Sequence, residues 1–237
     1  MAQPESSRVD VQEHGANNQT SSRRLYMQLQ AFGACDDPKR LTQALERAHV
    51  EGVLYADAAD PLGVGVLGIS EDPAFFVERW RELLGTEPFL GLRRKPELTM
   101  FGRTYSSGYE ADLEDWLLGR PRRTALAPEW PWAIWYPLRR TGTFARLSPQ
   151  EQGAILKEHA VLGRTYGEAD LAHDVRLACH GLDTHDNDFV IGLVGRELHP
   201  LSHLVQTMRA TKQTSEYIAH MGPFFVGYAR ARTRGEP

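Results

Sequence analysis

The densest group of potential metal ligands lies in the stretch DVRLACHGLDTHDNDF, which runs from Asp174 to Phe189. Its spacings match none of the zinc signatures, and the chain contains neither HExxH nor CxxC. The alternation in VRLACHG instead predicts a strand, and the polar residues of DTHDND predict a turn after it. We therefore expect a structural turn here and keep a divalent-metal site as the alternative. The candidate ligands would be His173, His180, His185, Asp174, Asp183, Asp186 and Asp188.

A different chemistry is suggested by a single histidine on a predicted helix. His159 lies in GAILKEHAVLGRTY, where Ile155, Leu162 and Tyr166 share its face. A histidine in such a position can be an ordinary core residue. It can also be the axial ligand of a haem, which needs one neutral imidazole on a rigid element beside an apolar pocket.

Three arginines also have two interpretations each. Arg176, on the predicted strand, is either a surface charge or a cationic donor aimed at an anion or a peroxide. Arg139 and Arg140 end the predicted strand WAIWYPLRR. This basic pair is either an exposed strand end or a binding site for carboxylates such as porphyrin propionates.

The elements that must position these residues follow the same order twice. In the first half, RRLYMQLQAF, GVLYADA, VGVLGIS and ELTMFGRTY are predicted strands. Helices are predicted at DDPKRLTQALERAH, with Asp37 as N-cap and Pro38 next to it, and at SEDPAFFVERWRELLG. The first half is therefore predicted to be β-α-β-β-α-β.

The second half repeats this order, from the strand WAIWYPLRR to the strand PFFVGYARA. Its first helix begins SPQEQ, where Ser148 is the cap, Pro149 occupies the first helical position and Glu151 completes a capping box. The strands DVRLACHG and DFVIGLVG and the helix HPLSHLVQTMRATKQ follow. The tetrapeptide GRTY occurs in both halves, but at positions that do not correspond, so we draw no conclusion from it.

Two consecutive split β-α-β units predict an α+β fold, a duplicated ferredoxin-like domain with helices on one face of each antiparallel sheet. We expect residues 1–22 to be a disordered tail. Residues 23–125 are the expected N-terminal half, and residues 126–237 the C-terminal half. The expected linker between them is the proline-containing stretch from LGRPRR to APEWPW.

Composition excludes several classes of function. An apolar content of 41% and a charged content of 24% are typical of soluble globular proteins. A net charge of −4 argues against a general nucleic-acid or membrane-surface role. No apolar run approaches the length of about 18 residues that a membrane span needs, and the N-terminus does not have the pattern of a secretory signal. We expect a cytoplasmic protein in which Cys35 and Cys179 are free thiols.

Four segments, taken in this order, resemble the chlorite dismutase superfamily, which includes the peroxide-dependent coproheme decarboxylases. They are WYPLRR, KEHAVLGRTY, GLDTHDNDF and MRATKQTSEYIAHMGPFFVG, and the resemblance extends over nearly all of residues 23–232. It implies a duplicated ferredoxin-like barrel of the dimeric α+β type, which agrees with the order of elements above. It also implies noncovalent haem in the C-terminal half and assembly into homo-oligomeric rings, often pentamers.

The resemblance assigns roles to individual residues. The proximal haem ligand of the family falls on His159, and the distal arginine of the chlorite dismutases falls on Arg176. The catalytic tyrosine of the decarboxylases falls on Tyr136, with Arg140 in place of a lysine. The acidic partner of the proximal imidazole is replaced in the segment Lys212–Gln213–Thr214, so that Gln213 would neighbour the cofactor beside Arg139 and Arg140.

Two enzymatic functions are implied, both those of a haem-dependent oxidoreductase. In the first, hydrogen peroxide is the oxidant, and Tyr136 becomes a radical that oxidises the propionates of coproheme to vinyl groups. In the second, chlorite is split into chloride and dioxygen, and Arg176 holds the anion. The cofactor would be haem b or coproheme. We prefer the decarboxylase, because Tyr136 favours it and haem synthesis is a common need, while Arg176 favours the dismutase. A haem carrier or sensor without activity is the third possibility.

Overall fold

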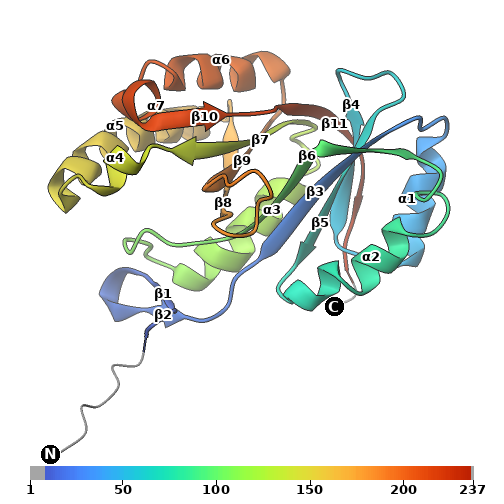
Figure 1. The fold of residues 1–237 in the computed structure, drawn as a ribbon, viewed down its shortest axis with the longest axis horizontal. Helices are drawn as coiled ribbons and strands as arrows, with labels where there is room; N and C mark the ends of the chain where they lie inside the picture. The colour runs from blue at the N-terminus through green and yellow to red at the C-terminus, as the bar shows by residue number, and fades with distance from the viewer. Residues whose placement is uncertain (1–8, 236–237) are drawn as a thin grey trace, which may run out of the picture.

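The computed structural model describes residues 9–235, and it has the mixed helix and strand content that the sequence predicts (Figure 1). The N-terminal half pairs its strands antiparallel in the order β4-β5-β3-β6. Asp37 caps the first helix by accepting a hydrogen bond from the Lys39 backbone amide. The elements of this half are β3 (Tyr26–Gly33), α1 (Pro38–Arg47), β4 (Gly52–Asp57), β5 (Val64–Ser70), η2 (Pro73–Phe76), α2 (Arg79–Leu84) and β6 (Arg93–Arg103).

The C-terminal half repeats this arrangement, with the strand order β11-β7-β9-β8. The predicted capping box is present, because Ser148 and Glu151 satisfy each other's backbone amides at the start of the longest helix. The elements of this half are β7 (Trp132–Arg140), α4 (Gly142–Ala145), α5 (Pro149–Glu168), β8 (His173–Ala178), β9 (Phe189–Gly195), α6 (Leu198–Met208), α7 (Lys212–Tyr217), β10 (Ile218–Met221) and β11 (Phe225–Thr233).

The two halves join through their outer strands. β11 pairs with β4 over six register pairs, whereas β6 pairs with β8 only at Arg103 and Ala178. Together with the pairings inside each half, these contacts close a ring of strands, and β10 extends β7 outside it. The α+β, duplicated ferredoxin-like fold is thereby confirmed.

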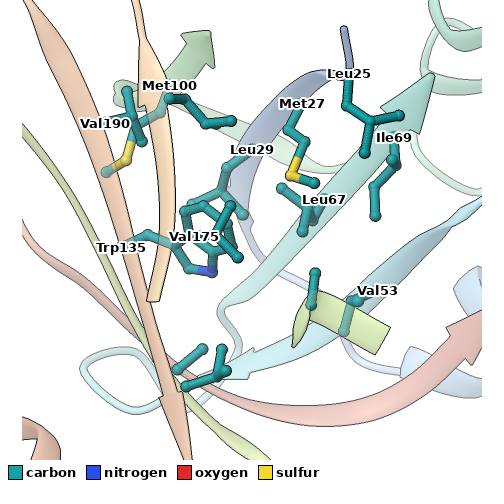
Figure 2. Close-up of a cluster of buried hydrophobic side chains, with 14 of the residues drawn as sticks. Leu25, Met27, Leu29, Val53, Leu67, Ile69, Met100, Trp135, Val175 and Val190 are labelled. Carbon is teal, nitrogen blue, oxygen red and sulfur yellow. The ribbon is translucent and has the colours of Figure 1, made fainter. Parts of the chain in front are cut away.

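Apolar side chains from both halves fill the inside of this ring (Figure 2). Leu29, Leu67 and Val53 come from the first half, and Trp135, Val175 and Val190 come from the second. Two further clusters lie outside the ring, where helices cover each sheet. One packs α1 and α2 on the N-terminal sheet, and the other packs α5 and α6 on the C-terminal sheet, on opposite sides of the molecule (Figure 1).

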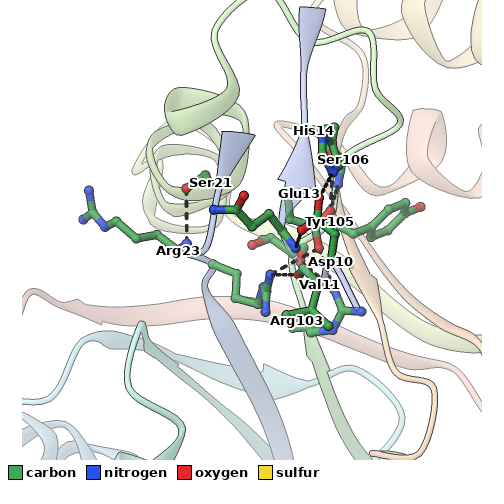
Figure 3. Close-up of polar contacts among 12 residues, drawn as sticks. Asp10, Val11, Glu13, His14, Ser21, Arg23, Arg103, Tyr105 and Ser106 are labelled. Carbon is green, nitrogen blue, oxygen red and sulfur yellow. Dashed lines mark hydrogen bonds and ion pairs between the residues drawn. The ribbon is translucent and has the colours of Figure 1, made fainter. Parts of the chain in front are cut away.

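Part of the expected disordered tail is structured. Residues 1–8 lie outside the described residues, but residues 9–22 contain the paired strands β1 (Glu13–His14) and β2 (Thr20–Ser21), with η1 (Ala16–Asn18) between them. Figure 3 shows how this segment docks: the Glu13 carboxylate accepts hydrogen bonds from the Ser106 backbone amide and from Arg103. Polar contacts order the segment, which is why an apolar pattern did not reveal it.

Two further expectations need correction. The expected linker forms a continuous helical segment, η3 (Asp115–Gly119) followed by α3 (Arg120–Leu126), and Pro121 lies inside it directly after the π-helical turn, where the regular hydrogen-bond ladder is already interrupted. The helix predicted over 70–85 is interrupted, since Glu78 has a non-helical backbone conformation between η2 and α2. Among the described residues, no helix has the length and apolarity needed to span a membrane.

Candidate functional site

His159 lies on the face of α5 that packs toward the C-terminal sheet, one turn from Ile155 and two turns from Tyr166, both of which are buried. The side chain is half-buried, and its Nδ1 atom is buried without a hydrogen-bond partner among the described residues. Burial lowers the pKa of His159 to about 4, and the positive charges of Arg176 and Arg140 act in the same direction. The imidazole is therefore neutral at pH 7.

The sheet face directed toward α5 carries the other predicted residues in register. Tyr136 on β7 pairs with Ile191 on β9, and Ile191 pairs with Arg176 on β8. Side chains in such a row share one face, so Tyr136 and Arg176 stand two strands apart, ~10 Å. The structure thus brings His159, Tyr136 and Arg176 to the same side of the C-terminal half.

Tyr136 is 6% exposed and packs against Phe224 with ring centroids 4.8 Å apart. Burial, followed by the negative charge of Asp174, raises the pKa of Tyr136 above its usual range. The phenol is therefore protonated at all physiological pH values, and any oxidation of it must release a proton as well as an electron.

Arg176 is held by a charged network rather than standing alone. Its Nε atom lies 2.6 Å from an oxygen of Asp174, and Arg120 lies 2.6 Å from the other oxygen of the same carboxylate. Both guanidinium groups also contact the ring of Trp116, with centroid distances of 4.6 Å for Arg120 and 5.1 Å for Arg176. Although burial opposes it, these two arginines hold the pKa of Asp174 below its usual value.

The two neighbouring arginines of β7 lie on different faces. Arg140 shares the face of Tyr136, and its guanidinium stacks between Phe144 and Phe189, 4.6 Å from each ring. Its Nε atom is buried and has no partner among the described residues, which leaves a donor available for a carboxylate. Arg139 points to the opposite face, where it lies 3.4 Å from Asp186.

Gln213 is 5% exposed on α7, and its Oε1 atom is buried without a partner among residues 9–235. The helix that carries it is tied to α5 through Glu158, whose carboxylate accepts a hydrogen bond of 3.0 Å from the Lys212 backbone amide. Gln213 therefore lies on the element that packs next to His159.

Sequence reasoning missed one residue of this region, Tyr105. It follows β6, and its ring packs at a tilt against that of Phe189, with centroids 5.5 Å apart. Burial raises the pKa of Tyr105, while the charges of Arg176 and Arg140 oppose that rise. The pairing of Arg103 with Ala178 brings it there across the two halves. The tetrapeptide GRTY at 102–105 ends in this tyrosine, but the second copy of GRTY does not reveal where Tyr105 lies in the fold.

The histidines and aspartates of 173–188 form no metal site in the described part of the chain, where no group of three or more potential ligands converges. His173 stacks on Trp130 at 3.6 Å, and His180 lies 3.2 Å from Asp188. The Asp183 side chain accepts a hydrogen bond from the backbone amide of His185. The polar stretch is a turn, as expected.

The donor set fits the haem that the sequence resemblance implies. Haem iron can bind a neutral imidazole. His159 meets this need, because its lowered pKa keeps the ring neutral and its Nδ1 atom has no hydrogen-bond partner among the described residues. The propionates of a porphyrin need a cationic donor at the pocket edge, which Arg140 can provide.

Several known proteins are similar to this chain. The family model described as chlorite dismutase matches residues 89–230. No curated protein sequence matches the chain. A haem-binding protein from Thermus thermophilus has a similar structure, with 19% identity and a TM-score of 0.68, covering 87% of this chain and 91% of its own. Chlorite dismutase from Candidatus Nitrospira defluvii, solved with imidazole, has 15% identity and a TM-score of 0.68, covering 89% of this chain and 93% of its own.

Proposed function

The chain belongs to the chlorite dismutase family, and from this premise we propose that it is a haem-dependent oxidoreductase that decarboxylates coproheme with hydrogen peroxide to give protohaem. One observation carries the choice of reaction. A buried and protonated phenol, Tyr136, occupies the sheet face whose charged residues act on His159.

In this proposal His159 would hold the haem iron, and Arg140 would bind a carboxylate of the porphyrin. Gln213, on the helix next to α5, is the candidate partner of the imidazole in place of an acidic residue. The bound haem supplies an iron at which peroxide reacts, and its own propionates are the substrate. Burial of the phenol and the aromatic wall of Phe224 and Phe189 keep water away from the reacting group.

Tyr136 is the residue we propose to carry the oxidation. Its hydroxyl holds its proton, so the phenol gives up an electron and a proton together and regains both from the propionate. Each propionate that is converted loses carbon dioxide, two electrons and a proton to become a vinyl group. One hydrogen peroxide takes up these two electrons and, with protons, becomes two waters.

The network around Arg176 also supports peroxide over chlorite. Capture of an anion needs a cationic donor that is free to move to it, but the Arg176 Nε atom is already engaged with Asp174 at 2.6 Å. Hydrogen peroxide is neutral and needs no such charge.

Chlorite dismutation is the alternative, and its support is the position of Arg176 in the same cross-strand row as Tyr136. Arg176 would then leave Asp174 to hold the chlorite anion. A non-catalytic haem carrier is a third candidate, favoured by Arg140 standing where the decarboxylase motif has a lysine.

The decisive experiment is a titration of the coproheme-loaded protein with hydrogen peroxide, followed by chromatography and mass spectrometry of the porphyrin. We expect conversion to protohaem in the wild type and in Tyr109→Phe, whose side chain is 87% exposed, and no conversion in Tyr136→Phe. Oxygen release from chlorite by the wild type, lost in Arg176→Ala, together with no conversion of coproheme, would replace the proposal with the alternative. Inactivity in both assays would leave the carrier.

We further propose that the protein acts as a cytoplasmic homo-oligomer, a pentameric ring. Light scattering of the haem-loaded protein gives its mass directly, and a monomeric mass at micromolar concentration would contradict this assembly.

A further inference from the structure

A second tyrosine of the C-terminal half is paired with a histidine. The Tyr166 hydroxyl on α5 lies 2.5 Å from Nδ1 of His203 on α6. The nearby hydroxyl of Thr207, 3.5 Å from Tyr166, donates its own hydrogen to the His203 carbonyl oxygen at 2.9 Å. The imidazole nitrogen is the nearer of the two, so in the tautomer whose hydrogen is on Nε2 it is the acceptor best placed for the Tyr166 proton.

The pair connects the interior to solvent. Tyr166 is 9% exposed and belongs to the cluster between helices and sheet that also contains Tyr136. His203 is exposed, so a proton that it accepts can pass to water. Tyr166 lies seven residues after His159 on the same face of α5, ~10 Å further along the helix axis.

This arrangement differs from that of Tyr136. Among the described residues the Tyr136 hydroxyl has no hydrogen-bond partner, whereas the Tyr166 hydroxyl has a base within direct reach. A phenol that loses an electron becomes a strong acid, so it is easier to oxidise where a base can take its proton at once. Tyr166 therefore has a proton acceptor beside its hydroxyl, as a reversible electron donor needs, and it lies between the proposed haem site and the surface.

We propose that Tyr166 and His203 form a proton-coupled electron-donor pair. In the step, Tyr166 gives one electron to an oxidised centre, the O–H bond breaks, and its proton forms an N–H bond at Nδ1 of His203. The products are a neutral tyrosyl radical and an imidazolium. The oxidant is the peroxide-treated haem site, and in this respect the inference rests on the proposed function. The pair would draw an oxidising equivalent away from Tyr136 when no propionate remains to be converted.

The test uses the full chain without haem, so that its outcome does not depend on the proposed reaction. Photogenerated tris(bipyridine)ruthenium(III) removes one electron, and electron paramagnetic resonance of rapidly frozen samples detects the radical. In a Tyr109→Phe background, which removes a phenol that is 87% exposed, we expect a tyrosyl signal and its loss when Tyr166→Phe is added. Tyr228→Phe is the control, since that side chain is exposed and its ring meets Trp132 edge to face, and it should keep the signal.

The variant His203→Gln separates a redox role from a structural one, because glutamine can accept a hydrogen bond but cannot take the proton. We expect it to fold and to lose the signal. An unchanged signal in Tyr166→Phe or in His203→Gln overturns the pair. In the haem-loaded chain treated with peroxide, a Tyr166-dependent radical is expected even where decarboxylation fails, and its absence there overturns the connection to the haem site.

Discussion

Arg176 and Asp174 stand two residues apart on β8, and the Nε atom of the arginine lies 2.6 Å from the carboxylate of the aspartate. Both side chains project from the outer face of the C-terminal sheet, which also carries Tyr136. A cation that could stabilise an anion at this site is thus already paired, and Arg120 is paired to the same carboxylate. The choice between a neutral and an anionic oxidant therefore depends on Asp174 as much as on Arg176.

Replacing Asp174 should make the site attract anions. In haem-loaded Asp174→Asn we expect the Kd for fluoride to fall by about fivefold, because an unmatched charge a few ångströms away is worth ~1 kcal/mol in a partly solvated setting. Spectroscopic titration measures this directly. Asp186→Asn is the control, since that carboxylate is 92% exposed beside Arg139 and should leave the Kd unchanged. A weaker fluoride affinity in Asp174→Asn would contradict the idea that Asp174 neutralises the site.

The same substitution predicts a pH dependence of stability in the protein without haem. Asp174 has a folded-state pKa below its unfolded value, because Arg176 and Arg120 favour the carboxylate against the cost of burial. Its contribution to the free energy of unfolding is therefore fully present above pH ~4 and is lost as the pH falls through the lower folded-state pKa. At pH 7, we expect Asp174→Asn to be less stable than the wild type by about 1–2 kcal/mol, after allowance for solvent screening of these half-exposed pairs.

Urea denaturation at pH 7 and pH 2.5 checks this prediction. The difference between wild type and Asp174→Asn should shrink at the lower pH, because the carboxyl of the unfolded wild type is then protonated and the ionised form no longer favours the folded state in full. A difference that is constant with pH would show that the loss comes from packing rather than from charge.

Arg140 and Arg139 make a matched pair for testing which face binds a carboxylate. In Arg140→Gln the Kd for coproheme should rise roughly tenfold or more, since loss of a charge-assisted hydrogen bond costs about 1.5–3 kcal/mol. Arg139→Gln should bind coproheme as the wild type does, because its side chain points to the opposite face toward Asp186. Equal weakening in both variants would mean that net charge, and not the buried position of Arg140, governs binding.

His159→Ala should bind haem with an altered absorption spectrum, and added imidazole should restore the wild-type bands by entering the space left by the side chain. His185→Ala is the control, since His185 lies exposed in the turn after β8. If His159→Ala kept the wild-type spectrum, another residue would be the ligand.

Local sequence patterns predicted much of the fold. Strand β7 has the predicted bounds, and the start of α5 follows from Ser148, Pro149 and Glu151 alone. These signals lie within a few residues of each other, so one sequence carries them completely. Prolines are usually read as helix breaks, so the helical segment 115–126 is not predicted; Pro121 lies where a π-helical turn already interrupts the regular hydrogen-bond ladder.

Contacts between distant segments were not predictable in the same way. Tyr105 reaches the candidate site only because β6 pairs with β8, and the partner of Tyr166 lies 37 residues away on another helix. No local pattern encodes which strands of two similar halves will pair. The position of Asp174 between two arginines likewise depends on packing of the segment 115–126 against β8.

The closed ring of strands has a consequence for how the polypeptide can be divided. Each half, cut free near residue 125, would expose an unpaired outer strand on each side, β4 and β6 in one case and β8 and β11 in the other. Open edges of this kind recruit other strands, so separated halves should associate with each other or with themselves. The sequence consists of two repeats in tandem, but the hydrogen bonds between their outer strands join them into one cooperative unit. We therefore expect one unfolding transition on heating rather than two.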